Sequence, residues 1–181
     1  EAVSAAEKET EQRKVIKIPV MVSETRYLRN NQVDTKVINI YEDGTDRLLE
    51  SVTYDKTGET VETAVTTYSG NESETLYHDK EKNLLKKRKN ITDSMGNMVE
   101  SVLFDSRGNQ ISKSLYSYGN TGTERTKWEI FDSSDLLLGY NLYHYEDGRL
   151  AKTESLSPSG TVEEYFLYSY DSNGNLVRSE R

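Results

Sequence analysis

Residues 168–181 read YSYDSNGNLVRSER, a polar turn between two segments of strand-forming residues. Within Asp171–Gly174 the aspartate side chain can accept a hydrogen bond from the backbone two residues on. The fourth residue must then enter the left-handed region, which glycine does without steric cost. A type I turn that ends in such a residue is a common connection of β-hairpins. The stretch therefore predicts a hairpin tip.

The same Asp-x-x-Gly pattern recurs upstream. The copies that fit best, and that we predict to be structural turns, are Asp55–Gly58, Asp93–Gly96, Asp105–Gly108 and Asp171–Gly174. The ten steps between Gly44 and Gly174 average about 13 residues, a period that indicates an internal repeat. Two copies carry another residue in the glycine position. We expect Asp135 to be tolerated there, and Lys82 to be strained or to adopt another turn type.

The spacing of these turns predicts the fold class. A turn about every 13 residues leaves about eight for the strand between, as in an antiparallel meander, whereas parallel pairing needs longer crossovers. The intervening segments are rich in valine, threonine, leucine and tyrosine: Val61–Tyr68, Val99–Phe104, Ile111–Tyr118, Leu136–Tyr145 and Val162–Tyr170. We expect an all-β fold, one strongly curved meander of hairpin repeats that forms an open barrel or two layers.

The N-terminal part differs in composition from the repeats. Residues 1–14 are polar and rich in alanine and glutamate, which predicts a flexible tether. Residues 15–22 alternate in the two-residue period of a strand, and Pro19 indicates that this strand lies at an edge or that the proline faces outward. We therefore expect a single β-repeat domain over residues 15–181.

Four segments also carry an aromatic residue before the turn: Tyr54–Gly58, Phe104–Asn109, Tyr145–Leu150 and Tyr170–Leu176. In this they resemble the YD repeat of RHS and YD-repeat proteins of bacterial surfaces, over roughly residues 41–181. The resemblance implies β-hairpins that build a long, curling antiparallel sheet. This chain is too short to form the toxin-enclosing shell of the large members. It is more similar to small bacterial envelope lipoproteins that carry such repeats alone.

Composition argues against several classes of partner. The 181 residues include 23 Lys and Arg against 31 Asp and Glu, a net charge of −8. Such a chain has no general attraction for nucleic-acid phosphates or anionic lipid, so we expect neither partner. The basic run Lys86–Lys89 is typical of a solvated or edge strand. No apolar run reaches the roughly 18 residues of a membrane helix, so we expect no integral membrane span.

Catalytic chemistry has little support in the sequence. Cysteine is absent, and His78 and His144 are the only histidines. Both follow the strand rhythm, which favours solvated strand residues over a catalytic or zinc site. The Asp171–Asn175 stretch has its glycine at the fourth position, whereas a calcium-binding EF-hand loop needs it at the sixth. We expect no catalytic residue, no cofactor and no metal.

The aromatic residues give the one candidate binding site. Most of the thirteen tyrosines recur with the repeat, which favours cross-strand aromatic pairing. Trp128 lies outside that rhythm, and Tyr140, Tyr143 and Tyr145 follow it closely. Flat rings on a rigid sheet can cover the faces of sugars, so these four residues are the candidate ligand contacts.

Two functions remain from the sequence. The first is a noncatalytic, exported interaction module that contacts a protein or a cell-surface polymer at a bacterial envelope. The second is a carbohydrate-binding module, or a weak glycosidase-like enzyme, that uses the aromatic sheet face. The chain begins at Glu1 rather than at a methionine. We therefore expect a trimmed lipoprotein, cell-envelope or extracellular, whose leader and lipid-bearing cysteine lay upstream.

Overall fold

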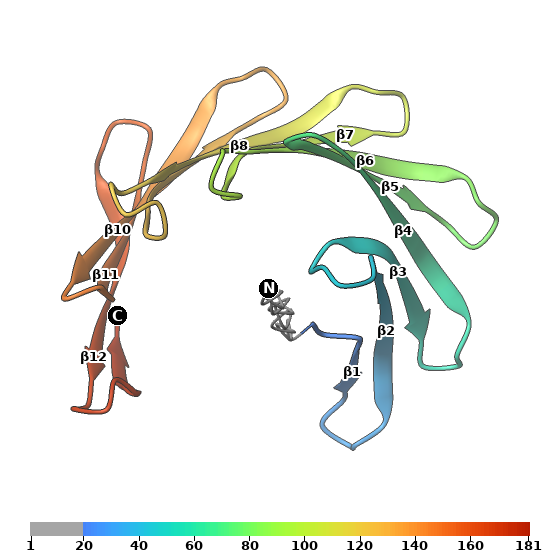
Figure 1. The fold of residues 1–181 in the computed structure, drawn as a ribbon, viewed down its shortest axis with the longest axis horizontal. Coiled ribbons are helices and arrows are strands. Elements are labelled where there is room, and N and C mark those ends of the chain that lie inside the picture. The colour runs from blue at the N-terminus through green and yellow to red at the C-terminus, as the bar shows by residue number, and fades with distance from the viewer. Residues whose placement is uncertain (1–19) are drawn as a thin grey trace, which may run out of the picture.

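The computed structural model describes residues 20–181, which form one antiparallel sheet of thirteen strands in sequence order (Figure 1). The strands are β1 (Ser23–Tyr27), β2 (Val33–Tyr41), β3 (Leu48–Asp55), β4 (Thr60–Ser69), β5 (Glu72–His78), β6 (Leu84–Thr92), β7 (Met98–Asp105), β8 (Gln110–Tyr118), β9 (Arg125–Phe131), β10 (Leu137–Glu146), β11 (Arg149–Leu156), β12 (Val162–Tyr170) and β13 (Leu176–Glu180).

The sheet bends into an arc whose two ends do not meet (Figure 1). The expected all-β antiparallel meander is therefore confirmed, as are the five strands predicted by residue range. The alternative of two layers is wrong for residues 20–181. Every strand there pairs only with its neighbours in sequence, and no second sheet covers the first.

The hairpin tips have the geometry that the Asp-x-x-Gly pattern predicts. At Asp105 the carboxylate Oδ1 accepts hydrogen bonds from the backbone N–H groups of Arg107 and Asn109, both at 2.8 Å. Gly108 has a φ of 88° and donates its N–H to the Asp105 carbonyl. The turns at Asp55, Asp93 and Asp171 repeat this arrangement. These carboxylates act in the turns, and their hydrogen bonds hold the pKa of each aspartate below its usual value.

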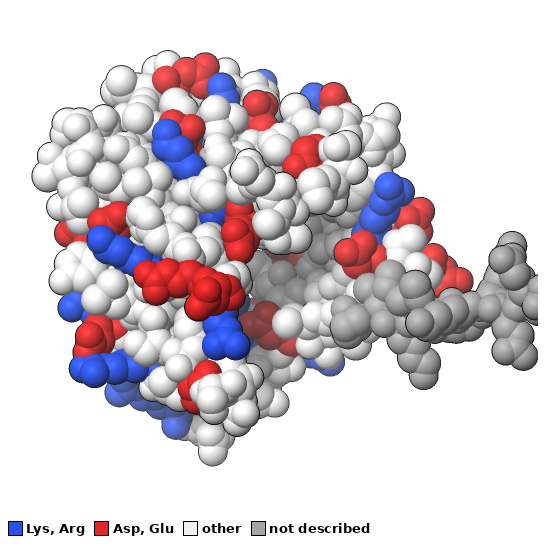
Figure 2. Space-filling view, turned by 60° about the vertical axis from the view of Figure 1, so that its left-hand side comes forward, with Lys and Arg blue, Asp and Glu red and all other residues white. Residues whose placement is uncertain are grey.

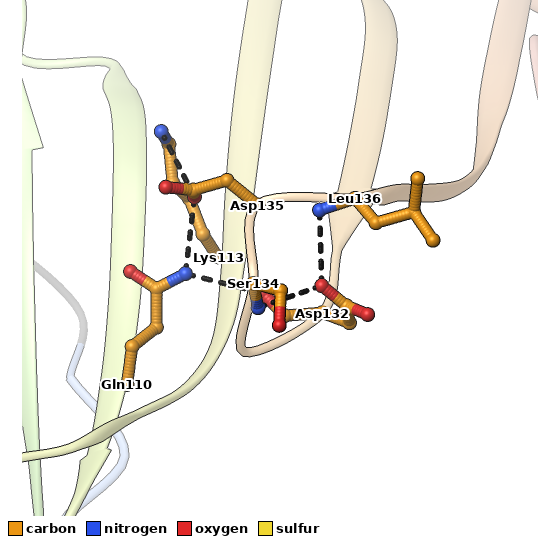
Figure 3. Close-up of polar contacts among 6 residues, drawn as sticks. All are labelled: Gln110, Lys113, Asp132, Ser134, Asp135 and Leu136. Atoms are coloured by element: carbon orange, nitrogen blue, oxygen red, sulfur yellow. Dashed lines mark hydrogen bonds and ion pairs between the residues drawn. The ribbon is translucent and has the colours of Figure 1, made fainter.

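The two degenerate copies adopt the same turn. Lys82 has a φ of 67° and Asp135 a φ of 59°, so both enter the left-handed region without being glycine. The carboxylate of Asp135 reaches across to β8, where it accepts from Gln110 Nε2 at 3.0 Å and pairs with Lys113 Nζ at 3.5 Å (Figure 3). The hydrogen bond from Gln110 and the charge of Lys113 lower the pKa of Asp135. Lys82 keeps the aspartate turn instead of adopting another type.

The strand register divides the side chains into two faces. We call one the polar face because residues with hydroxyl and amide side chains lie opposite one another along the middle of its strands. They are Ser51, Thr53, Thr66, Ser73, Thr75, Asn90, Ser101, Ser112, Ser114, Asn141, Thr153 and Ser155. We call the other the mixed face because aliphatic residues alternate there with charged ones. Its members include Val52, Val65, Leu76, Lys87, Lys89, Val102, Lys113, Leu115, Glu129, Leu142 and Glu154.

The core is very small for a sheet of this size. Within residues 20–181 the buried apolar side chains are Val102 and Leu156, and no large side chain is completely buried. The buried polar residues are Thr66, Thr75 and Ser101, all on the polar face. The backbone ladders and the cross-strand contacts therefore hold the sheet together, with little help from a hydrophobic interior.

Two local expectations differ from the structure. Residues 15–19 of the first expected strand lie outside the described residues, and residues 20–22 precede β1, which begins at Ser23. Alternation of apolar residues missed β1 because its sequence, SETRY, is polar on both faces. The basic run Lys86–Lys89 lies in β6, an interior strand, so the edge-strand alternative is wrong. Acidic neighbours explain its place, because Glu62 pairs with Lys86 and Glu74 with Lys87.

Candidate functional site

The connection between β8 and β9 is where the repeat is least regular. The candidate binding residues lie on the strands beside this connection. This loop runs through Gly119 and Gly122, and its Gly122 carbonyl accepts a hydrogen bond from Asn97 of the β6–β7 turn at 2.6 Å. β9 starts directly after it at Arg125. The loop is thereby hydrogen-bonded to a neighbouring hairpin tip just before β9 begins.

Four side chains form what we call the aromatic cluster: Tyr116, Arg125, Trp128 and Tyr143. Tyr116 and Trp128 are direct cross-strand partners, and their rings stack with centroids 6.1 Å apart and an interplanar angle of 20°. The guanidinium of Arg125 lies 4.9 Å from the Tyr116 ring centroid and 5.8 Å from that of Tyr143. The cluster thus combines a flat aromatic surface with a cation on the polar face.

The charge of Arg125 is favoured by its surroundings. Burial opposes the charged form, but interactions with the hydroxyls of Tyr118 and Tyr143 outweigh it and raise the pKa of Arg125. The side chain therefore stays cationic at any physiological pH.

Hydrogen-bonding groups surround the indole ring. Asn141 is the cross-strand partner of Trp128 on β10, and its Oδ1 accepts from Ser155 Oγ at 2.6 Å. By contrast, Trp128 Nε1 and Arg125 Nε are buried atoms with no hydrogen-bond partner. A third such atom, Asn90 Oδ1, lies further along the same face. Buried polar groups in native proteins are nearly always paired, so these atoms need an explanation.

The structure separates the four aromatic residues that the sequence grouped. Tyr143 joins Trp128 in the aromatic cluster, and Tyr145 shares their face. Tyr140 is paired with Glu129 and so lies on the opposite, mixed face, where Lys127 Nζ lies 4.9 Å from its ring centroid. Tyr140 cannot contact a ligand bound at Trp128 on the other side of the sheet.

Tyr145 belongs to a structural series. Tyr68 Oη donates to the Leu48 carbonyl at 3.1 Å, Tyr118 Oη to that of Met98 at 3.0 Å, and Tyr170 Oη to that of Leu150 at 3.0 Å. Each tyrosine thus reaches a backbone group twenty residues upstream. Tyr41 Oη likewise donates to the Met21 carbonyl. Thr92 Oγ1 donates to the carbonyl of Asn71, which lies 21 residues upstream. Tyr145 occupies the corresponding position near the end of β10, with Arg125 twenty residues upstream. Burial and the nearby charge of Glu124 raise the pKa of Tyr145.

Sequence reasoning missed Arg125 and Tyr116 as members of the site and gave the recurring tyrosines a different role. It expected cross-strand aromatic pairs, whereas Tyr116–Trp128 is the one aromatic ring pair within residues 20–181. A signal was present in the sequence: a tyrosine lies at or next to the end of five of the six even-numbered strands, at Tyr41, Tyr68, Tyr118, Tyr145 and Tyr170, and Thr92 ends the sixth. That spacing indicates a two-strand unit of about 26 residues, and the tyrosines mark its end.

Other candidate sites are internally satisfied. A shallow groove of about 390 Å³ crosses β4–β7, but its Glu74 pairs with Lys87 and Lys89. On β10 and β11, His144 Nε2 and Lys152 Nζ lie 2.7 and 2.6 Å from the two carboxylate oxygens of Glu154, and these contacts lower the Glu154 pKa. Acidic and basic side chains lie interspersed on the surface shown in Figure 2. Residues 20–181 contain no group of three or more metal-ligating side chains.

Comparison with known proteins gives only distant likenesses. No family model and no curated protein sequence matches the chain. Among solved structures, a porin-like protein from Bacteroides uniformis is 10% identical, with a TM-score of 0.48, over 83% of this chain and 53% of its own. A porin-like protein from Bacteroides vulgatus is 14% identical, with a TM-score of 0.46, over 82% of this chain and 92% of its own. The chain spans about half the length of the first of these proteins.

A third structure, TarM, is 14% identical, with a TM-score of 0.24, over 65% of this chain and 19% of its own. At TM-scores below 0.5 none of these likenesses carries a functional argument. In the part of the chain that the structure describes, no helix has the length and apolar character needed to cross a membrane.

Proposed function

We propose that this chain is a noncatalytic, exported binding module of a bacterial cell envelope, which contacts a protein or a surface polymer through the polar face of its sheet. One observation carries the proposal. All the buried side-chain polar atoms without a partner in residues 20–181, namely Asn90 Oδ1, Arg125 Nε and Trp128 Nε1, belong to residues of the polar face. Polar groups left without partners in the protein are groups that a ligand can satisfy.

Two further features support this function. No other strand of residues 20–181 covers the polar face, and the face is rich in hydroxyl and amide groups, which suits a partner with many hydrogen-bonding groups of its own. His78 and His144 lie on β5 and β10, far apart in the strand order, so they do not share a site for acid–base chemistry. The resemblance of the repeats to those of YD-repeat envelope lipoproteins supports the proposed export and lipid anchor.

The test measures retention of the full chain on isolated cell-envelope material with two matched variants of β8. Ser114→Gln adds a neutral, longer side chain to the polar face, and Ser117→Gln adds the same group to the mixed face. We expect saturable retention that Ser114→Gln weakens at least tenfold and Ser117→Gln leaves unchanged. No saturable retention, or equal effects of the two variants, would contradict the proposal.

A carbohydrate is the second candidate partner, and the stacked Tyr116–Trp128 pair favours it. The stacked rings offer a flat apolar surface, and the adjacent Asn141 with its hydrogen-bonded neighbour Ser155 offers partners for hydroxyls; sugar recognition requires both. A glycan array with Trp128→Ala, and with Tyr140→Ala as the opposite-face control, tests it. Specific binding that only Trp128→Ala removes supports the candidate, and the absence of any glycan binding excludes it.

A further inference from the structure

Arg125 has neither an acidic partner nor a hydrogen-bond partner for its Nε within residues 20–181. Arg88 of the polar face also lacks an acidic partner, but its guanidinium donates to Ser101 Oγ at 3.1 Å. The ion pairs within residues 20–181 join other side chains, and none includes Arg125. Its guanidinium is instead held among the rings of Tyr116 and Tyr143. A partly buried charge without a counter-ion is unfavourable, and an anion that reached it would be bound more strongly than in open water.

The two unpartnered donors of the aromatic cluster point to the same kind of ligand. Arg125 Nε and Trp128 Nε1 are both N–H groups, so each needs an acceptor atom. A carboxylate has two acceptor oxygens and a full negative charge, and it forms short, charge-assisted hydrogen bonds with a guanidinium. Arg125 is only partly shielded from solvent, so a carboxylate can reach its guanidinium. The guanidinium lies over the Tyr116 ring, which also stacks with Trp128.

We propose that the aromatic cluster binds a carboxylate-bearing sugar unit within an otherwise neutral glycan. The carboxylate pairs with Arg125 and Trp128 Nε1, and the sugar ring covers the Tyr116–Trp128 surface. Asn141, the cross-strand partner of Trp128, and Ser155, which donates to Asn141 from the next strand, provide partners for the sugar hydroxyls. This inference rests on the proposed binding function of the polar face, and it adds a ligand class and the residue that selects it.

The charge of the whole chain limits the ligand to isolated acidic units. The net charge is −8, and the carboxylate of Glu124 precedes Arg125 in the chain. The negative charge of the chain would repel a polymer with a carboxylate on every sugar. A single acidic unit instead gains the local attraction of Arg125. An acidic peptide offers the same charge but no hydroxyl-rich ring for the stacked aromatic surface.

The test uses the fluorescence of Trp128, which is the only tryptophan of the chain and therefore reports on this site alone. The full chain is titrated with a disaccharide that contains glucuronic acid, with the corresponding glucose disaccharide, and with an acidic tripeptide, all at the same ionic strength. The variants are Arg125→Gln and, as a matched control, Arg149→Gln. Arg149 also lies against a tyrosine, 5.8 Å from the Tyr170 ring centroid, but far from Trp128 in the strand order.

We expect a saturable fluorescence change with the acidic disaccharide and at least tenfold weaker binding of the neutral one. Arg125→Gln should weaken binding of the acidic disaccharide at least tenfold, and Arg149→Gln should leave it unchanged. Equal responses to the two disaccharides, equal or tighter binding of the tripeptide, or equal effects of the two variants would overturn the inference. The proposed function would survive that result if Ser114→Gln still reduced retention on envelope material.

Discussion

Lys82 and Asp135 occupy equivalent left-handed positions of the repeat, yet their side chains differ in what they do. Asp135 is bound by Gln110 and Lys113 of β8, so part of the cost of its backbone conformation is offset. The side chain of Lys82 is exposed and forms no hydrogen bond or ion pair within residues 20–181. The left-handed conformation costs an ordinary residue roughly 1–2 kcal/mol, which glycine avoids.

Substitution by glycine at these two positions should therefore have different effects. We expect Lys82→Gly to raise the free energy of unfolding by about 1 kcal/mol, because it removes the strain and loses no contact. Asp135→Gly relieves the same strain but loses the contacts with β8, so its gain should be smaller or negative. Urea unfolding of both variants measures the difference. A gain from Asp135→Gly equal to that of Lys82→Gly would show that the Asp135 contacts contribute nothing.

At the scale of the elements, the repeating unit is a pair of strands rather than a single strand. Tyr41, Tyr68, Tyr118 and Tyr170 each lie at or next to the end of an even-numbered strand and donate a hydrogen bond to a backbone carbonyl near the start of the strand before it, as Tyr68 does with Leu48. This hydrogen bond joins the C-terminal end of one strand to the N-terminal end of the strand before it, in a sheet with almost no buried core. Its net value in such a setting is about 1 kcal/mol.

Removal of one tyrosine hydroxyl should measure this contribution. We expect Tyr68→Phe to lower the free energy of unfolding by about 1 kcal/mol, since the Leu48 carbonyl loses its side-chain donor. Tyr165→Phe is the control, because Tyr165 lies on the mixed face and is 45% exposed. Its effect should stay within about 0.5 kcal/mol. Urea unfolding with unchanged m-values distinguishes the two, and equal losses would contradict the structural role of the Tyr68 hydroxyl.

At the scale of the whole molecule, stability is built from neighbour to neighbour. Each strand of residues 20–181 contacts only the strands adjacent to it in sequence, and the arc in Figure 1 brings no distant strands together. Repeat proteins with such contacts have a stability that is nearly a sum of local terms, and they can open in part without unfolding completely.

Hydrogen exchange should therefore show a gradient along the chain. We expect the backbone amides of β5–β9 to be the best protected and those of β1 and β13 the least, because the outer strands have a neighbour on one side only. Tyr68→Phe should speed exchange in β3–β5 and leave β11–β13 unchanged. Mass spectrometry of peptides after timed exchange measures both effects. Uniform protection, or a change that spreads over the whole sheet, would indicate one cooperative unit instead.

The local order of this protein is contained in its sequence. Asp-x-x-Gly needs an aspartate acceptor and a left-handed fourth residue, so its spacing predicted the tips of the hairpins and the lengths of the strands between them. Short turns allow only antiparallel neighbours, and this gave the meander. Alternation along β10 puts Tyr140 and Tyr143, three residues apart, on opposite faces, so their grouping in one candidate site conflicted with the strand pattern.

Tertiary structure alone decided how these strands combine. Alternation in one strand says nothing about the register of the next, so the sequence could not place Trp128 beside Tyr116 and Asn141. It could not show that Arg125, at the start of β9, would lie over two tyrosine rings from neighbouring strands. The choice between two layers and one open arc likewise depends on small twists that add up over thirteen strands. Those twists arise between strands, where single-residue patterns carry no information.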